Sequence, residues 1–137
     1  MTRVRAQGAR TRKSATQIPE AVRREVTRRG EELVARKFAL LLEPKTSIRK
    51  RDFNYAVAVF TEWRGPSFYL CTRYRTPEAR PIEEFVVRSA RLEFAGQGRF
   101  HLSYFRHTDR WQALYHGLTL EQCFETIEDC EVFWPVT

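Results

Sequence analysis

The histidines His101, His107 and His116 are the side chains of this chain best suited to metal binding or proton transfer. If the segments flanking His107 pair as a hairpin, His101 and His116 become cross-strand neighbours, at a separation that suits metal ligands. No cysteine or carboxylate is aimed there as a third ligand, so we expect no metal site. His107 beside Asp109 could act as a base and its orienting carboxylate. Both fall in an exposed hairpin tip, however, so we interpret Asp109 as a turn former and predict no catalytic residue.

Sequence patterns of known active sites and cofactor sites are absent. The chain has no G-x-S-x-G, no Gly-rich phosphate loop, no H-E-x-x-H and no C-x-x-C. Cys71, Cys123 and Cys130 are an odd number without ligand spacing, which is typical of reduced thiols in a cytoplasmic protein. We therefore predict a cytoplasmic protein without a cofactor, for which an enzyme with a site near His107 and Asp109 is the least favoured class.

Positive charge is concentrated at one end of the chain. Residues 1–51 carry 15 Lys or Arg against 5 Glu, whereas residues 52–137 carry 9 Arg against 12 Asp or Glu. A basic arm on a nearly neutral body is typical of proteins that engage RNA, DNA or an acidic protein surface, although such an arm can also be a solvated tail. The predicted nucleic-acid-binding residues are Arg3, Arg5, Arg10, Arg12, Lys13, Arg23, Arg24, Arg28, Arg49, Lys50 and Arg51.

A second group of arginines alternates with aromatic residues farther along the chain. A guanidinium beside an exposed ring is one way in which a sheet surface holds single-stranded nucleic acid. Strand alternation points Arg73 away from Tyr74, and the core needs most of the rings, so we rank this signal below the basic arm. The group comprises Arg73, Arg75, Arg88, Arg91, Arg106 and Arg110, with Tyr74 and Trp111.

These side chains must be positioned by strands. The segment from Phe100 to Thr119 alternates apolar and polar residues on both sides of a turn, the pattern of a half-buried hairpin. Pairing about a short turn places Leu102 opposite Tyr115 and Tyr104 opposite Ala113, on one apolar face. Similar alternation over residues 55–63, 68–75 and 84–94, with short turns between, predicts a five-stranded antiparallel meander.

Two amphipathic helices are predicted to cover that apolar face. Pro19 begins the first, Pro19–Leu42, in which Gly30 lies on the apolar stripe, so either the sheet comes very close there or the helix is weak. Thr119 and Gln122 form a capping box at the start of the second, Leu120–Cys130. The predicted fold class is α+β. Residues 1–17 are expected to be a mobile basic arm and residues 18–137 a single domain, and no apolar run is long enough to span a membrane.

The C-terminal block from Arg106 to Ile127 resembles the ending of small uncharacterised bacterial proteins. The shared features are the RHTDRW turn and strand and the GLTLEQ helix start. This resemblance implies a bacterial cytoplasmic origin and brings no site residue. The function predicted is therefore a non-catalytic binding module, in which the basic arm and first helix engage an acidic partner such as nucleic acid. The alternative is a protein-interaction or homodimerisation domain that uses the free face of the sheet.

Overall fold

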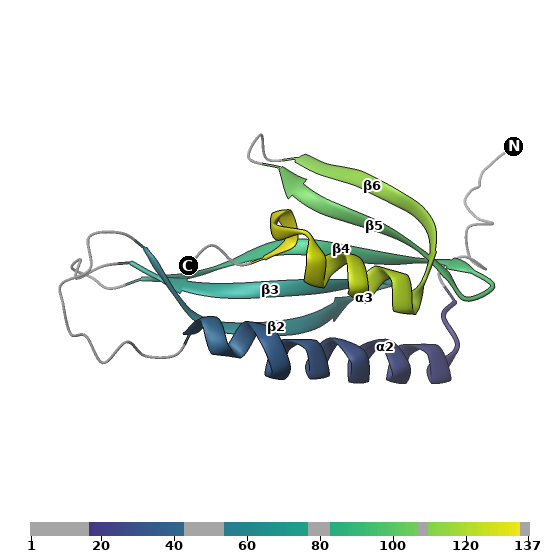
Figure 1. The fold of residues 1–137 in the computed structure, drawn as a ribbon, viewed down its shortest axis with the longest axis horizontal. Coiled ribbons are helices and arrows are strands. Elements are labelled where there is room, and N and C mark those ends of the chain that lie inside the picture. The colour runs from purple at the N-terminus through teal and green to yellow at the C-terminus, as the bar shows by residue number, and fades with distance from the viewer. Residues whose placement is uncertain (1–16, 43–53, 77–82, 107–109, 135–137) are drawn as a thin grey trace, which may run out of the picture.

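The structure is a computed structural model that describes residues 17–42, 54–76, 83–106 and 110–134. A five-stranded antiparallel sheet forms its body, with the strands in sequence order (Figure 1). This arrangement confirms the predicted meander. The strands are β2 (Tyr55–Arg64), β3 (Ser67–Arg75), β4 (Glu84–Gly96), β5 (Arg99–Arg106) and β6 (Arg110–Thr119).

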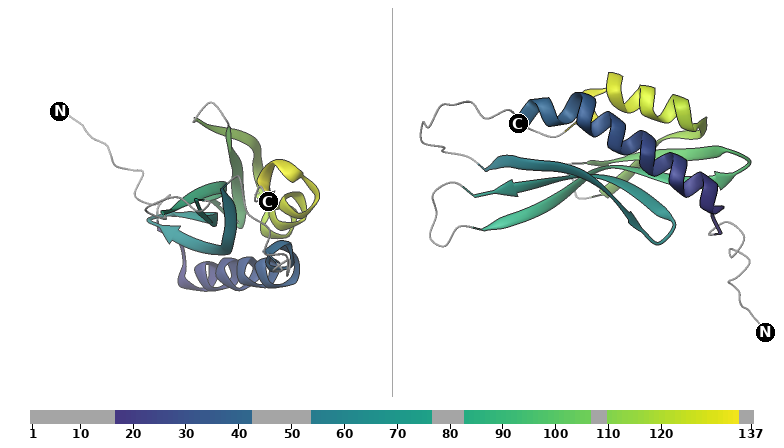
Figure 2. Two further views of the ribbon diagram at one scale, coloured as in Figure 1. Left: turned by 90° about the vertical axis from the view of Figure 1, so that its left-hand side faces the viewer. Right: turned by 90° about the horizontal axis from the view of Figure 1, so that it is seen from below.

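The helices lie together on one side of the sheet, as predicted (Figures 1 and 2). Pro19 precedes the first helix, which ends in a π-helical and then a 3-10 turn. At the second helix, Thr119 accepts a hydrogen bond from the amide of Gln122 at 3.1 Å, and the Gln122 side chain accepts one from the amide of Thr119 at 2.9 Å. The predicted capping box is thus confirmed. The helical elements are α2 (Glu20–Leu33), η1 (Val34–Phe38), η2 (Ala39–Leu42), α3 (Leu120–Asp129) and η3 (Glu131–Phe133).

The core fills the space between the helices and the sheet. Gly30 lies where α2 packs tightly against β3, because a Cβ atom at this position would be 2.7 Å from Cζ of Phe68. Of the two interpretations of this glycine, close approach of the sheet is therefore correct. The apolar stripe of α2 faces inward, as predicted. Buried apolar side chains of this layer include Val26, Leu33, Phe68, Leu70, Leu92, Phe100, Leu102, Phe124 and Ile127.

The register of the last hairpin differs from the prediction at one pair. Leu102 lies opposite Tyr115 as expected, but Tyr104 lies opposite Gln112, and Ala113 opposite Ser103. The cause is a pair of bulges, since β6 has an extra residue on each side of Tyr115. Because side chains alternate between faces, each extra residue reverses the face of those beyond it. The predicted single apolar face on β6 is therefore wrong.

Candidate functional site

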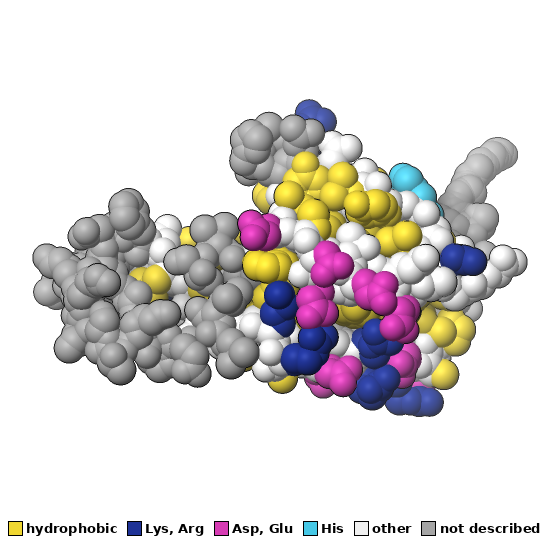
Figure 3. Space-filling model, viewed as in Figure 1, with side chains coloured by type: hydrophobic (Ala, Val, Ile, Leu, Met, Phe, Trp, Pro, Cys, Tyr) yellow, Lys and Arg dark blue, Asp and Glu magenta, His cyan; other side chains and the backbone are white. Residues whose placement is uncertain are grey.

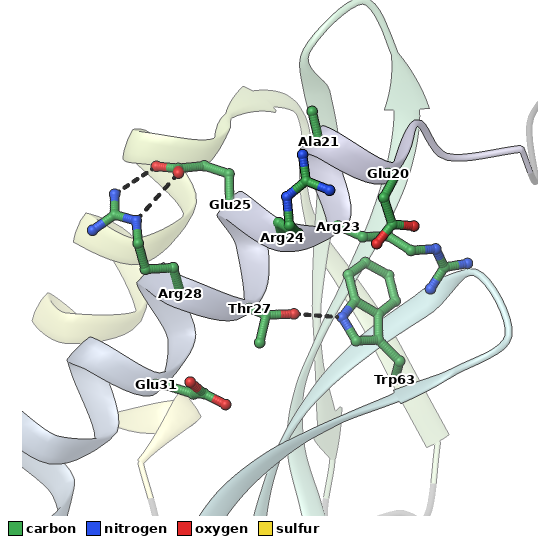
Figure 4. Close-up of a pocket in the computed structure, with 9 residues that line it drawn as sticks. All are labelled: Glu20, Ala21, Arg23, Arg24, Glu25, Thr27, Arg28, Glu31 and Trp63. Carbon is green, nitrogen blue, oxygen red and sulfur yellow. Dashed lines mark hydrogen bonds and ion pairs between the residues drawn. The ribbon is translucent and has the colours of Figure 1, made fainter.

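Two of the predicted binding residues, Arg24 and Arg28, lie on the exposed side of α2 (Figure 4). Arg28 makes an ion pair with Glu25 at 2.7 Å, and its hydrogen bonds to this carboxylate lower the pKa of Glu25. A second carboxylate, that of Glu32, lies 4.0 Å from Arg28. Arg24 makes no ion pair with the described residues. The carboxylates of Glu25 and Glu32 thus partly offset the charge of Arg28, and Arg24 is the one of the two without an ion pair among the described residues.

Arg23 is held against the end of the β2–β3 hairpin. Its guanidinium lies 4.4 Å from the centroid of the Trp63 ring, and it donates a hydrogen bond to the carbonyl of Gly65 at 3.3 Å. Trp63 in turn donates from Nε1 to the hydroxyl of Thr27 at 2.9 Å (Figure 4). These contacts fasten α2 to the sheet, so Arg23 has a structural role. An open groove of about 770 Å³ runs here, lined by Glu20, Ala21, Arg23, Arg24, Glu25, Thr27, Arg28, Glu31 and Trp63.

The helix layer as a whole does not present a continuous basic stripe. Its α2 and η1 carry six Lys or Arg against four Glu, and α3 carries four acidic residues and no basic residue. The two signs alternate over this face of the molecule (Figure 3). Ion pairs such as Arg36–Glu128, at 2.6 Å, tie the two helices together. This surface is thus charged but close to balanced.

The other sequence-predicted site residues are not placed. The predicted catalytic alternative, His107 with Asp109, lies outside the described residues. So do all eight predicted binding residues of the arm and of the connector after the first helix, namely Arg3, Arg5, Arg10, Arg12, Lys13, Arg49, Lys50 and Arg51.

The strands hold positive charge on the face opposite the helices, which we term the open face. The five strands carry eight arginines against three glutamates. Ala90 and Leu92 are buried beneath the helices, so Arg91 between them projects from the open face. By the same alternation Tyr69 and Arg73 lie on the open face of β3, between the buried side chains of the helix face.

A bulge in β4 brings Arg88 to the same face as Arg91. Leu70 of β3 pairs with Ala90, but the next residue of β3, Cys71, pairs with Arg88, so Ser89 is an extra residue. The Ser89 hydroxyl donates to the carbonyl of Phe133 at 2.9 Å, on the helix side. Residues three apart on a regular strand would face opposite sides. The bulge thus creates a pairing of arginines that strict alternation does not predict.

Three arginines of the open face lie over aromatic rings. Arg73 lies 5.1 Å from the ring centroid of Phe60, and Arg88 lies 5.6 Å from that of Tyr69. The third, Arg91, lies 4.7 Å from the ring centroid of Trp111. Each is within the range of a cation–π contact. We call Arg73, Arg88, Arg91, Phe60, Tyr69 and Trp111 the arginine–aromatic ladder.

Glutamates of the strands are shared among these arginines. Glu62 accepts a hydrogen bond from Arg88 at 2.8 Å and lies 3.4 Å from Arg64, and its bond with Arg88 lowers the pKa of Glu62. Five arginines share three glutamates in this way, which leaves an excess of positive charge on the open face. The other pairs are Arg75–Glu84 at 2.6 Å, Arg73–Glu84 at 3.9 Å and Arg91–Glu93 at 3.6 Å.

The predicted neighbours His101 and His116 do meet across the last hairpin. Their ring centroids are 4.8 Å apart, and Nδ1 of His101 accepts a hydrogen bond from the amide of Gly117 at 3.3 Å. No three His, Cys, Asp or Glu side chains among the described residues are grouped so as to hold a metal ion. The two rings therefore pack against each other near the edge of the sheet, and Nδ1 of His101 is occupied by its hydrogen bond with the backbone.

The three cysteines are free thiols, and two of them have low reactivity. Cys71 and Cys123 are buried, and burial raises their pKa to about 11 and about 12, respectively. Because the thiolate is the reactive form, neither is a nucleophile near neutral pH.

Comparison with known proteins places the chain in a family. The model of the domain of unknown function DUF3024 matches residues 10–135. No curated protein and no solved structure matches. No helix of the described residues is long and apolar enough to cross a membrane. The match confirms the prediction of an uncharacterised family.

Proposed function

This chain belongs to the DUF3024 family, a domain of unknown function, and we propose that it is a non-catalytic module that binds single-stranded RNA or DNA on the open face of its sheet. The observation that carries this proposal is the arginine–aromatic ladder, with three guanidinium–ring contacts on one face. Guanidinium groups bind phosphates, and the flat faces of rings accept unstacked bases. Both kinds of group are required for sequence-tolerant binding of a single strand, and the ladder supplies both.

The ion pairs within the ladder are compatible with phosphate binding. A guanidinium has five N–H donors, and one carboxylate engages two of them at most. Arg88 donates from Nε and Nη2 to one oxygen of Glu62, so its other nitrogen keeps its donors. The ion pairs with the glutamates restrict these side chains before a strand binds, which lowers the entropy lost on binding.

The open face is a better candidate than α2 for the main contact. Two carboxylates lie within 4.0 Å of Arg28, whereas each arginine of the ladder has one. Arg23 is engaged with Trp63 and Gly65. The acidic α3 lies beside α2, and Arg29 reaches Glu121 of that helix at 3.8 Å. A polyanion approaching the helix layer therefore meets both signs of charge. Basic residues of the N-terminal segment would add salt-dependent attraction to a strand already held on the sheet.

A binding titration with charge-matched variants tests the proposal. Wild-type protein and a labelled single strand of about 12 nucleotides are titrated at several salt concentrations by fluorescence anisotropy. Replacing Arg73 and Arg88 by Gln is expected to weaken binding and flatten the salt dependence by about 0.7 per arginine lost. Replacing Arg24 and Arg28 by Gln removes the same charge from α2 and should have little effect. Equal losses for both pairs would contradict the assignment to the open face.

A second candidate function rests on a separate observation. The edge strand β6 exposes Leu114 and Tyr115, to 38% and 41%. An edge strand with exposed apolar side chains is a template for pairing with another chain. If the domain dimerises through β6, light scattering will give twice the monomer mass and high salt will not reduce it. Nucleic-acid binding through the ladder, in contrast, should become weaker as the salt concentration rises.

A further inference from the structure

Two polar atoms of the open face are buried without a hydrogen-bond partner among the described residues. They are Oγ of Ser103 and Nε of Arg91. Ser103 is 1% exposed. The carboxylate of Glu93 lies 3.6 Å from Nε of Arg91, which is too long for a hydrogen bond. A buried donor left unsatisfied destabilises the fold, so two together require an explanation.

The two atoms belong to residues that face each other. Arg91 of β4 and Ser103 of β5 are paired in the sheet register. Directly opposed residues of an antiparallel pair have Cβ atoms about 5 Å apart on the same face. An N–H donor on a cation and an O–H donor thus project from opposed positions of the same face. That combination suits a single anionic oxygen.

Aromatic rings cover this pair of donors. Trp111 lies over the guanidinium of Arg91 at 4.7 Å, and its ring centroid is 5.6 Å from that of Tyr69 and 5.3 Å from that of Phe105. Trp111 comes from β6 and Tyr69 from β3, so the curl of the sheet brings nonadjacent strands together on the open face. The rings offer a stacking surface directly beside the donors.

We infer that Arg91, Ser103 and Trp111 form one nucleotide subsite of the open face. A phosphodiester oxygen accepts hydrogen bonds from Nε of Arg91 and Oγ of Ser103, and the adjoining base stacks on Trp111, which turns aside to admit it. This inference rests on the proposed function and deepens it, because it names the atoms that hold one phosphate. It also accounts for the two buried donors, which the bound strand satisfies.

The test uses full-length protein and the same labelled single strand of about 12 nucleotides. Replacing Ser103 by Ala is expected to weaken binding about tenfold with an unchanged salt slope, since a neutral donor to a charged acceptor is lost. Replacing Arg91 by Gln should weaken binding and lower the slope by about 0.7. Replacing Trp111 by Leu should weaken binding about tenfold, the effect of one lost stack.

Thr72 provides the matched control. Its hydroxyl is also buried without a partner among the described residues, but it projects from β3 toward the helices. Replacing Thr72 by Val should leave binding unchanged. Thermal unfolding of the Ser103→Ala protein is expected at or above the wild-type temperature, because an unsatisfied group is removed. A weaker complex from an equally stable variant is then an effect on the site.

The outcomes separate the two proposals. If wild-type protein binds no single strand at low salt, both the function and the subsite are overturned. If wild-type protein binds and Arg73→Gln with Arg88→Gln weakens it, but Ser103→Ala does not, the function stands and the subsite is wrong. If Thr72→Val weakens binding as much as Ser103→Ala, the effect is structural and the subsite is also wrong.

Discussion

Arg88 and Arg91 of β4 are three residues apart in the sequence, and yet both lie over aromatic rings of the same face, Tyr69 and Trp111. The extra residue Ser89 makes this possible. A regular strand would have sent one of the two arginines toward the helices. The bulge thus places both arginines of β4 on the open face, where each contacts an aromatic ring.

The bulge gives a first prediction. Deleting Ser89 removes the extra residue, so Arg88 adjoins Ala90 and regular alternation keeps every side chain on its present face. The variant is therefore expected to lose little stability beyond that of the Ser89 hydrogen bond and to keep single-strand binding. Urea unfolding and anisotropy measure the two effects. The replacement Ser89→Ala is the control, because it keeps the register and removes only the hydrogen bond to the carbonyl of Phe133. A deletion variant that is folded but no longer binds a single strand, while Ser89→Ala still binds, would contradict the assignment of Ser89 as the extra residue.

Gly30 gives a second prediction, on the packing of α2 against β3. In most helices a Gly→Ala replacement stabilises the protein by about 1 kcal/mol. Here the added Cβ would lie 2.7 Å from the ring of Phe68, which is itself buried. Gly30→Ala should therefore destabilise the fold by about 1–3 kcal/mol in urea unfolding. The second-site replacement Phe68→Leu should reduce that effect, and a stabilised Gly30→Ala protein would disprove the close approach.

The capping box of α3 gives a third prediction. Thr119→Ala removes the acceptor for the amide of Gln122 and should cost about 1 kcal/mol of unfolding free energy. Thr119→Ser retains the hydroxyl and should be nearly neutral. If the alanine and serine variants unfold at the same urea concentration, the cap does not contribute to stability.

Acid stability gives a fourth prediction. The hydrogen bond from Arg88 lowers the pKa of Glu62 in the folded protein below its usual value of 4.5. The stabilisation is therefore present above about pH 4.5 and is lost as the pH falls through the folded-state pKa. Glu62→Gln should lower the melting temperature at neutral pH and have a smaller effect near about pH 3. The matched control is Glu125→Gln on α3, which makes no ion pair with the described residues. A difference between wild type and Glu62→Gln that does not change with pH would contradict the pairing with Arg88.

Thiol reactivity gives a fifth prediction. Burial raises the pKa of Cys71 to about 11 and of Cys123 to about 12, whereas Cys130 is only half-buried. A thiol reagent added to the native protein near neutral pH should therefore modify Cys130 first and the other two only on unfolding. Peptide mapping by mass spectrometry identifies the modified residue. Rapid labelling of Cys71 would mean that the open face is less tightly packed than described.

Much of the fold was predictable because it follows from local patterns. Alternation marked all five strands, and Thr119 with Gln122 marked the start of α3. Gly30 left two interpretations open, a close approach of the sheet or a weak point in the helix, and the sequence could not decide between them. The bulges were not predicted. Gly117, with φ of +71°, was a signal that could have been used for β6, whereas Ser89 has no side-chain feature that requires a bulge.

The candidate site was harder to predict than the fold. The net charge of each sequence region favoured the basic arm and α2. A count of charges does not show that Arg28 is paired with Glu25. The open face emerges only when Tyr69 and Trp111, which are far apart in the sequence, meet across the curled sheet. Contacts of this kind depend on tertiary structure and leave no short motif.

Photocrosslinking of a bound single strand tests the central claim most directly. A strand carrying a photoreactive base is irradiated with the full-length protein, and the attachment site is identified by mass spectrometry. The account predicts crosslinks to Tyr69 and Trp111 on the open face. Crosslinks confined to Trp63 and α2, on the helix side, would contradict it.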